Sequence, residues 1–168
     1  LHANPIIPNR VVVIGAGGFV GGAIRKKLSA EGVNTLALTR KEINLLADGA
    51  AEKLQGLLQP TDSVVMVSAV APAKTISDLM QNLKMAEAVC NALSATNIAH
   101  LVYISSDAVY ADDANPVNER SYCAPSTIHG MMHAARELML KSSTRAPYAA
   151  LRPSLLYGAA DPHNGYGP

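Results

Sequence analysis

The sequence has little charge and few cysteines. Charged residues make up 16% of the 168 positions, and 14 Lys and Arg against 13 Asp and Glu leave a formal net charge of +1. Without a broad basic field, we expect no nucleic-acid partner. The two cysteines, Cys90 and Cys123, form no CxxC pair and no ligand cluster. This indicates free, buried thiols, no metal site and a reducing, cytoplasmic location.

Long apolar runs are also missing. The longest, residues 64–71, contains Ser68 and is closed by Pro72, far short of the ~20 residues that a membrane-spanning helix needs. We therefore expect no membrane partner. The hydrophobic fraction of 49% is nevertheless too high for a disordered chain, and the length suits a domain with a real core.

Short apolar runs alternate with longer segments of helical periodicity. Runs ended by glycine or proline suit strands buried on both faces, as parallel strands are. The pattern predicts strands at 11–14, 35–39, 42–45, 63–68, 99–104 and 148–151, and helices at 18–30, 48–58, 76–95 and 126–141. The alternation indicates an α/β fold with a doubly wound parallel sheet, the Rossmann fold, and places the ligand at the carboxyl ends of the strands.

A glycine-rich loop lies between the first strand and the first helix. Gly15 permits a sharp turn, Gly18 permits the backbone to approach a pyrophosphate, and Gly21 permits close packing of helix and sheet. Together with Phe19 and Val20, these residues open a helix whose free N–H groups suit phosphates. The context predicts a dinucleotide site, with a purely structural glycine turn as the alternative.

The end of the second strand bears on the choice of dinucleotide. An acidic residue here would bind the ribose 2′-hydroxyl of NAD, but the stretch 38–41 carries none before Glu42. Arg40 could instead bind a 2′-phosphate through charge-assisted hydrogen bonds. We favour NADP and keep NAD open, because Arg40 could also be a solvated charge at a strand end.

Six motifs in order along the chain resemble the extended branch of the short-chain dehydrogenase/reductase family, which contains nucleotide-sugar epimerases, dehydratases and reductases. The matches are GxxGxxG at 15–21, Ser-Ala-Val at 68–70, Asn-Leu-Lys at 82–84, Ser-Ser-x-x-Val-Tyr at 105–110, Pro-x-x-Glu at 116–119, and Arg-Pro with Leu-Tyr-Gly at 152–158. The resemblance implies an NAD(P)-binding Rossmann domain over 1–158. Residues 159–168 would begin a substrate-binding portion that is truncated or disordered.

The same resemblance implies roles for several residues. Ser106 falls at the catalytic Ser or Thr that binds the substrate oxygen, and Asp107 falls where dehydratases and some reductases carry Asp. Ser68, Ala69 and Val70 stand where the family often has an Ala-Ala pair lining the cofactor. A Ser106 that merely caps the strand end is the alternative.

The sequence departs from the family at its central Tyr-x-x-x-Lys motif. Alignment of Gly130 and Glu137 places His129 at the Tyr position and His133 at the Lys position. The spacing of four puts both rings on one helix face. His129 could pass the proton, because an imidazole titrates near neutrality, and His133 could hydrogen-bond the nicotinamide ribose. A zinc pair is not favoured, since no Glu separates the histidines and no third ligand is evident.

The expected function is NAD(P)-dependent hydride transfer on a nucleotide-linked sugar, the small-molecule substrate. The alternative is a catalytically impaired dinucleotide-binding protein, a redox sensor or scaffold, because both proton-relay residues are replaced. The resemblance further implies a homodimer through helices 76–95 and 126–141.

Overall fold

A computed structural model of the protein describes residues 6–112, 116–158 and 161. Its centre is a parallel five-stranded sheet in the order β2-β1-β3-β4-β5. The strands are β1 (Arg10–Ile14), β2 (Thr35–Leu38), β3 (Asp62–Met66), β4 (His100–Ile104) and β5 (Tyr148–Leu151). This confirms the predicted Rossmann fold.

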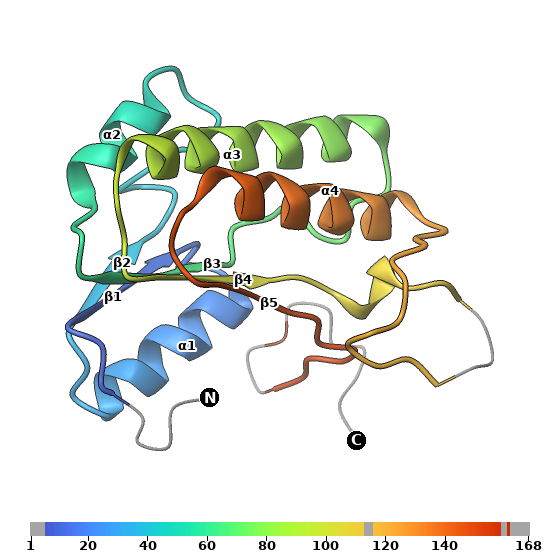
Figure 1. Cartoon of the computed structure of the whole chain (residues 1–168), viewed down its shortest axis with the longest axis horizontal. Coiled ribbons are helices and arrows are strands. Elements are labelled where there is room, and N and C mark those ends of the chain that lie inside the picture. The colour runs from blue at the N-terminus through green and yellow to red at the C-terminus, as the bar shows by residue number, and fades with distance from the viewer. Residues whose placement is uncertain (1–5, 113–115, 159–160, 162–168) are drawn as a thin grey trace.

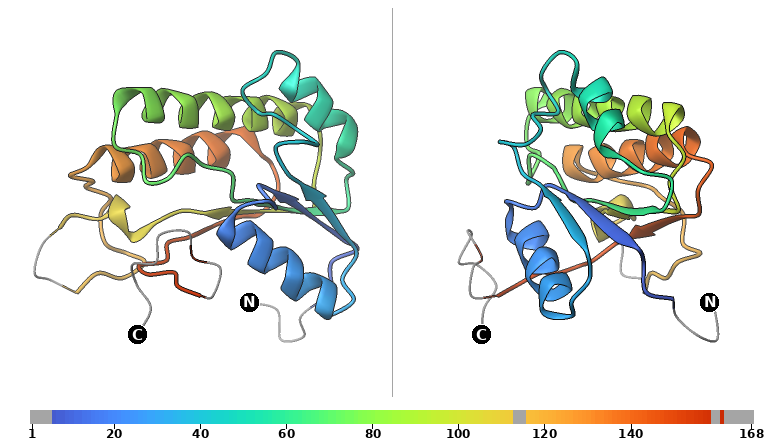
Figure 2. Two further views of the ribbon diagram at one scale, coloured as in Figure 1. Left: turned by 180° about the vertical axis from the view of Figure 1, so that it is seen from behind. Right: turned by 90° about the vertical axis from the view of Figure 1, so that its left-hand side faces the viewer.

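Helices cover both faces of the sheet, which makes three layers. α1 (Phe19–Ala30) lies on one face, and α2 (Ala50–Leu57), α3 (Ile76–Ala95) and α4 (Ile128–Ser143) lie on the other (Figure 1). The two further views show the same sides, with α3 and α4 running next to each other (Figure 2). A short 3₁₀ turn, η1 (Asp107–Val109), follows β4.

The core lies between the sheet and the helices on each face. Alternate β1 residues point to opposite sides, so Val12 and Ile14 pack toward α2–α4 while Val11 and Val13 pack toward α1. All four are at most 4% exposed. Burial on both faces explains why β1 is a continuous apolar run.

The predicted strand at 42–45 is wrong. The segment is a turn in which Ile43 N–H bonds to the Thr39 carbonyl and the Glu42 carboxylate accepts hydrogen bonds from Thr39. Ile43 and Leu45 are buried, 4% and 5% exposed, so this alternation serves loop packing rather than a strand. The next helix is capped by Gly49 and begins at Ala50, two residues later than predicted.

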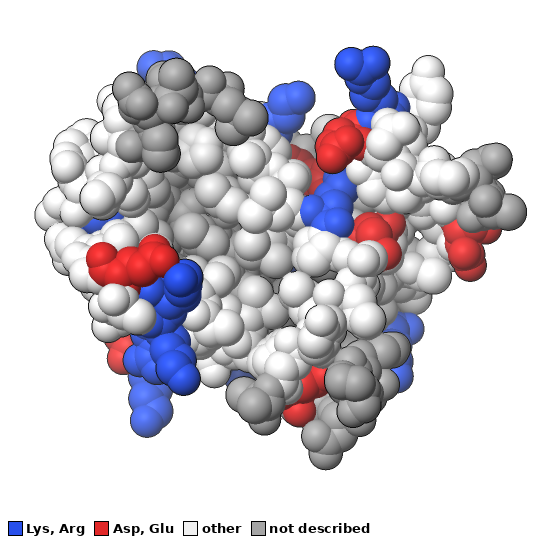
Figure 3. All heavy atoms as spheres, turned by 90° about the horizontal axis from the view of Figure 1, so that it is seen from below, with Lys and Arg blue, Asp and Glu red and all other residues white. Residues whose placement is uncertain are grey.

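Further predictions concern the longest helix, the cysteines, membrane-spanning helices and the C-terminal segment. α3 spans the predicted residues 76–95. Cys90 and Cys123 are both free; Cys90 is buried as predicted, but the prediction is wrong for Cys123, which lies exposed in the loop before α4. No helix within the described ranges is long and apolar enough to cross a membrane. On the face that α1 covers, charged side chains lie in scattered groups around a largely uncharged centre (Figure 3). Of the predicted segment 159–168, only Asp161 is among the described residues.

Candidate active site

The glycine loop after β1 is built by two close backbone approaches. Gly15 has φ +99°, and a Cβ there would lie 2.6 Å from the Ser68 backbone nitrogen. At Gly21 a Cβ would lie 2.1 Å from the Gly15 carbonyl oxygen. Both positions therefore require glycine because a side chain would collide with the protein's own backbone, as predicted for the turn and for helix packing.

Gly18 differs from these two glycines. Its φ is −81°, and a Cβ there would meet only the Gly15 carbonyl oxygen, at 3.6 Å. No described neighbour explains glycine here, whereas a phosphate crossing the loop would need the Cβ to be absent. The first turn of α1 carries no acidic residue and no side-chain cap, which also suits an anion.

A cleft of about 180 Å³ opens beside this loop. Its lining includes five of the residues predicted to bind the cofactor, namely Gly15, Arg40, Ser68, Ala69 and Val70. They meet because β1, β2 and β3 are parallel neighbours, so their carboxyl ends share one edge of the sheet. Two further predicted residues lie on other hollows: Phe19 beside Gly18, and Val20 in a second cleft with Asp107.

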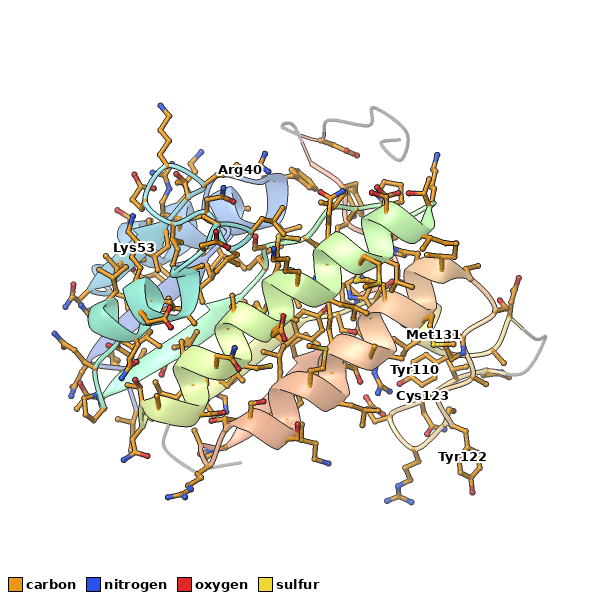
Figure 4. All side chains as sticks on the ribbon, turned by 90° about the horizontal axis from the view of Figure 1, so that it is seen from above. Arg40, Lys53, Tyr110, Tyr122, Cys123 and Met131 are labelled. Atoms are coloured by element: carbon orange, nitrogen blue, oxygen red, sulfur yellow. The ribbon has the colours of Figure 1, made fainter. Side chains whose placement is uncertain are left out.

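Arg40 lies at the rim of the first cleft (Figure 4). Its guanidinium makes no ion pair with any described residue. The nearest acid in sequence, Glu42, accepts hydrogen bonds from the Thr39 backbone and hydroxyl, which lower its carboxyl pKa. The acid is therefore engaged within the chain while the guanidinium stays free for an anion.

Ser106 and Asp107 lie where β4 ends. The Ser106 Oγ accepts a hydrogen bond from Ala108 N–H at 3.2 Å and donates to Asp107 Oδ1 at 3.3 Å. Ser106 thus caps η1 and holds its hydroxyl at the carboxyl edge of the sheet. Asp107 faces a cleft of about 770 Å³, whose lining includes Val20 and Arg152.

Helix α4 approaches this turn through Gly130. A Cβ at Gly130 would lie 1.9 Å from the Ala108 carbonyl oxygen, so only glycine permits the contact. The close approach brings His129 near Asp107, whose charge acts on the imidazole. The predicted catalytic residues of β4 and α4 therefore gather at one place.

His129 and His133 share one face of α4, as their spacing predicts. Their ring centroids are 4.7 Å apart in an edge-to-face arrangement. The Ala73 backbone N–H donates to His129 Nδ1 at 3.3 Å. Because an amide nitrogen can only donate, the neutral ring carries its hydrogen on Nε2. Burial lowers the His129 pKa, against an opposing effect of the Asp107 charge.

His133 is only 5% exposed and contacts a buried tyrosine. Its Nδ1 lies 2.7 Å from the Tyr103 hydroxyl oxygen. Burial, with smaller effects from His129 and Arg136, lowers the His133 pKa from 6.5 to about 3. The ring is therefore neutral at physiological pH, unlike the family's lysine with which the sequence motif aligns it.

A cation does lie nearby, one turn later on α4. Arg136 is fully buried, donates to the Ser68 carbonyl at 2.6 Å and to Asn82 Oδ1 at 3.2 Å, and lies 5.2 Å from the Tyr103 ring centroid. No described carboxylate pairs with it. Because Ser68 and Asn82 lie on other elements, Arg136 links the segment that lines the first cleft to α4 and α3.

A second network ties α4 to the chain beyond β5. The Glu137 carboxylate accepts from Ser105 Oγ at 2.6 Å and is bidentate with Arg152 at 2.9 and 2.7 Å. Arg152 also donates to the Tyr110 hydroxyl and to Cys123 Sγ. Tyr110 and Cys123 lie together near the start of α4, away from Arg40 (Figure 4). Arg152, the arginine of the Arg-Pro motif, thus connects α4 to the segments that contain Tyr110 and Cys123.

The sequence reasoning missed Tyr103, Ala73 and Arg136. Tyr103 carried one signal, since it lies two residues before Ser105, which directly follows β4, and the period of two in extended chain gives both residues the same face. Arg136 lies three residues after His133, which places both on one side of a helix. Nothing in the sequence pointed to Ala73, whose contribution is a backbone amide.

Fold and site together define an α/β protein with a dinucleotide-binding edge. Residues 11–167 match the sequence profile of the NAD dependent epimerase/dehydratase family, and the chain belongs to this family. The resemblance to the extended short-chain dehydrogenases/reductases is therefore confirmed, and with it a nicotinamide dinucleotide as the cofactor class. Among the described residues, no group of three His, Cys, Asp or Glu side chains could hold a metal ion.

Individual relatives differ in what they act on. The chain is 32% identical to a 2-alkyl-3-oxoalkanoate reductase of Shewanella oneidensis, over 90% of this chain and 46% of the relative. It is similar in structure to a UDP-N-acetylglucosamine 4-epimerase from Bacillus cereus, with 26% identity, TM-score 0.79, and 91% and 58% of the two chains covered. A dTDP-4-dehydrorhamnose reductase from Bacillus anthracis in complex with NADP shares the fold, at 22% identity and TM-score 0.72 over 91% and 56% of the chains. The chain spans about half the length of the curated relatives it matches.

Proposed function

We propose that the protein is an NADP-dependent enzyme that interconverts a carbonyl and a hydroxyl group on a nucleotide-linked sugar, as a reductase, epimerase or dehydratase does. One arrangement supports the proposal. Ser106, Asp107, His129 and His133 lie at the same edge of the sheet as the glycine loop and its cleft. Substrate and cofactor would meet there, over the carboxyl ends of the strands.

The residues divide the chemistry among them. When bound, the nicotinamide ring supplies the hydride donor or acceptor. Ser106 Oγ binds the substrate oxygen, and Asp107 is an acid–base group beside Ser106. His129 presents Nε2–H to the same oxygen, where a neutral imidazole stabilises the negative charge that develops as the C=O bond accepts the hydride. The proton that completes the hydroxyl group comes from solvent. His133 binds the nicotinamide ribose.

Arg40 supports NADP as the cofactor. Its guanidinium lies at the cleft rim without an ion pair to any described residue, and a structural relative in complex with NADP shares the fold. Calorimetry should show that the full-length protein binds NADPH more tightly than NADH. Arg40→Ala should weaken NADPH binding roughly 10- to 100-fold, the effect of losing a charge-assisted hydrogen bond, and leave NADH unchanged. Equal effects on both dinucleotides would contradict the assignment to the 2′-phosphate.

A turnover assay tests the function itself. Full-length protein with NADPH and a panel of keto nucleotide-sugars should consume reduced nicotinamide, with products identified by mass spectrometry. Ser106→Ala should lower kcat roughly 100-fold or more, as loss of a polar group at the reacting oxygen does. The matched control is Ser94→Ala, because that hydroxyl donates only to backbone carbonyls at the far ends of α3 and α4. Tight NADPH binding without turnover on any substrate would favour the sensor or scaffold instead.

A second substrate class has its own support. The relative at 32% identity is a reductase of 2-alkyl-3-oxoalkanoates, which are oxo acids rather than sugars. Ser106 and His129 would bind a ketone oxygen of either class in the same way. Running the same assay with a 2-alkyl-3-oxo acid separates the two, since turnover of the oxo acid alone would contradict the sugar substrate.

We also propose a homodimer through α3 and α4. Four large apolar side chains on these helices are exposed, Ile76 by 73%, Met80 by 59%, Met131 by 50% and Leu138 by 71%. A second copy would remove this surface from water. Sedimentation should give a dimer that Leu138→Glu dissociates. A wild-type protein that stays monomeric at high concentration would refute this assembly.

A further inference from the structure

Tyr103 has no part in the function proposed above, yet it contacts the site from beneath. It belongs to β4 and is 1% exposed. Its hydroxyl makes one hydrogen bond among the described residues, to His133 Nδ1 at 2.7 Å. His133 is the residue that stands in place of the family's lysine.

The direction of this hydrogen bond follows from the two groups. Burial raises the Tyr103 pKa to about 12, so the phenol keeps its proton and needs an acceptor. Nδ1 of the neutral His133 ring is the acceptor within reach. The reverse assignment would leave the O–H unpaired in a buried place, which is unfavourable. Tyr103 therefore donates, and the hydrogen of the His133 ring is on Nε2.

We propose that Tyr103 is a positioning residue, whose hydroxyl holds His133 in the Nε2–H tautomer so that the neutral imidazole presents an N–H donor to the ribose of the cofactor. The inference rests on the proposed function for the ribose contact. It goes beyond that function in assigning a role to Tyr103. Neither Nε2–H nor any other group of His133 makes a second hydrogen bond within the described part of the chain.

The substitution of lysine by histidine creates the need for such a partner. An ammonium group carries three hydrogens and donates in any rotamer, whereas a neutral imidazole has one hydrogen on one of two nitrogens. Protonation would remove the ambiguity, but Arg136 and His129 on the same helix both oppose a positive charge on His133. The hydrogen can still be held on Nε2 by a hydrogen bond to Nδ1, and a bond to the other ring nitrogen commonly fixes the tautomer of metal-binding histidines in the same way.

The tautomer is directly measurable. Long-range ¹H–¹⁵N spectra of full-length protein labelled at histidine, with the signal assigned through His133→Gln, should show His133 as Nε2–H. Tyr103→Phe should shift it toward Nδ1–H or a mixture. Tyr148→Phe is the matched control, because this tyrosine on the adjacent strand has a buried hydroxyl with no hydrogen-bond partner among the described residues. It should leave the His133 signal unchanged.

Cofactor affinity gives the second readout. Tyr103→Phe should weaken NADPH binding roughly 3- to 10-fold, the range for one neutral hydrogen bond, and Tyr148→Phe should not. In a His133→Lys background the effect of Tyr103→Phe should vanish, because lysine needs no tautomer partner.

Each result decides a separate point. A wild-type His133 in the Nδ1–H form, or a Tyr103→Phe protein with the wild-type tautomer, overturns the role of Tyr103. An altered tautomer with unaltered affinity overturns the ribose contact. If the wild-type protein binds no dinucleotide, the proposed function fails, and the spectra still decide whether Tyr103 fixes the tautomer.

Discussion

Replacing Gly130 with alanine tests how α4 is held against η1, the turn after β4. The added Cβ would lie 1.9 Å from the Ala108 carbonyl oxygen, 2.8 Å from the carbonyl carbon and 2.9 Å from Pro125 Cβ. Non-bonded heavy atoms settle about 3.5 Å apart, so α4 and the turn would have to separate by roughly 1.5 Å. The two nearest opposing atoms belong to the Ala108 backbone and the third to the ring of Pro125, so none of them can rotate away.

The expected loss follows from two opposing effects. Alanine favours a helix over glycine by about 1 kcal/mol, whereas overpacking costs about 1–3 kcal/mol and more where the backbone must move. We expect the free energy of unfolding to fall by roughly 2 kcal/mol, which lowers Tm by about 4–8 °C at this chain size. Activity should fall further, because a displacement of about 1 Å at a catalytic group costs about 100-fold.

Urea unfolding and turnover of the same samples check both effects. Gly56→Ala is the matched control: this glycine is also helical, but a Cβ there meets nothing within 4 Å. It should be neutral or stabilising by up to about 1 kcal/mol and fully active. If Gly130→Ala is as stable and as active as Gly56→Ala, the contact between α4 and η1 does not position the site.

Three other changes probe buried charge. His133 stays neutral down to about pH 3 in the folded protein but titrates near pH 6.5 in the unfolded chain. The free energy of unfolding should therefore fall as the pH drops below 6.5, by up to about 1.4 kcal/mol per pH unit from this residue. Urea unfolding at several pH values should show a weaker pH dependence of stability for His133→Gln. Arg10→Met should lower the free energy of unfolding by about 3–5 kcal/mol, because it leaves the fully buried Asp62 carboxylate without its cation. Lys27→Met, which breaks an exposed ion pair, should lower it by less than about 1 kcal/mol. Similar losses for the two variants would contradict this reasoning. Arg136→Met should raise the His133 pKa in NMR titrations, since the guanidinium opposes its protonation, and an unchanged or lower value would refute that coupling.

Much of the fold was predictable because its strands are buried on both faces. A run such as Val11 to Ile14, ended by Gly15, leaves few alternatives to a central parallel strand. The failure at 42–45 has the opposite cause. Ile43 and Leu45 alternate like strand residues, but no strand lies beside them at the edge of the sheet; they fill the space between loop and core.

The positions of the main site residues were predictable from the sequence, but the hydrogen-bond partners of the two histidines were not. Spacing alone placed His129 and His133 on one helix face, and the end of β4 placed Ser106 at the same edge. The groups that fix the two rings are Ala73 and Tyr103, which lie 56 and 30 residues away in the chain. Only the tertiary structure brings them to Nδ1 of each ring.

Arg136 shows what the histidine substitution means physically. Arginine is rarely buried without an acidic partner, so its place on the same side of the helix as His133 was not enough to predict that it lies in the core. It lies one turn after His133, where its guanidinium bonds the Ser68 carbonyl and faces the Tyr103 ring. The positive charge that the family's lysine carries at the ribose is thus found one turn along α4, beneath the cofactor cleft rather than in it. At that position it opposes a positive charge on His133. In the proposed site two neutral N–H donors would then depend on hydrogen-bond geometry, where the family's site depends on charge.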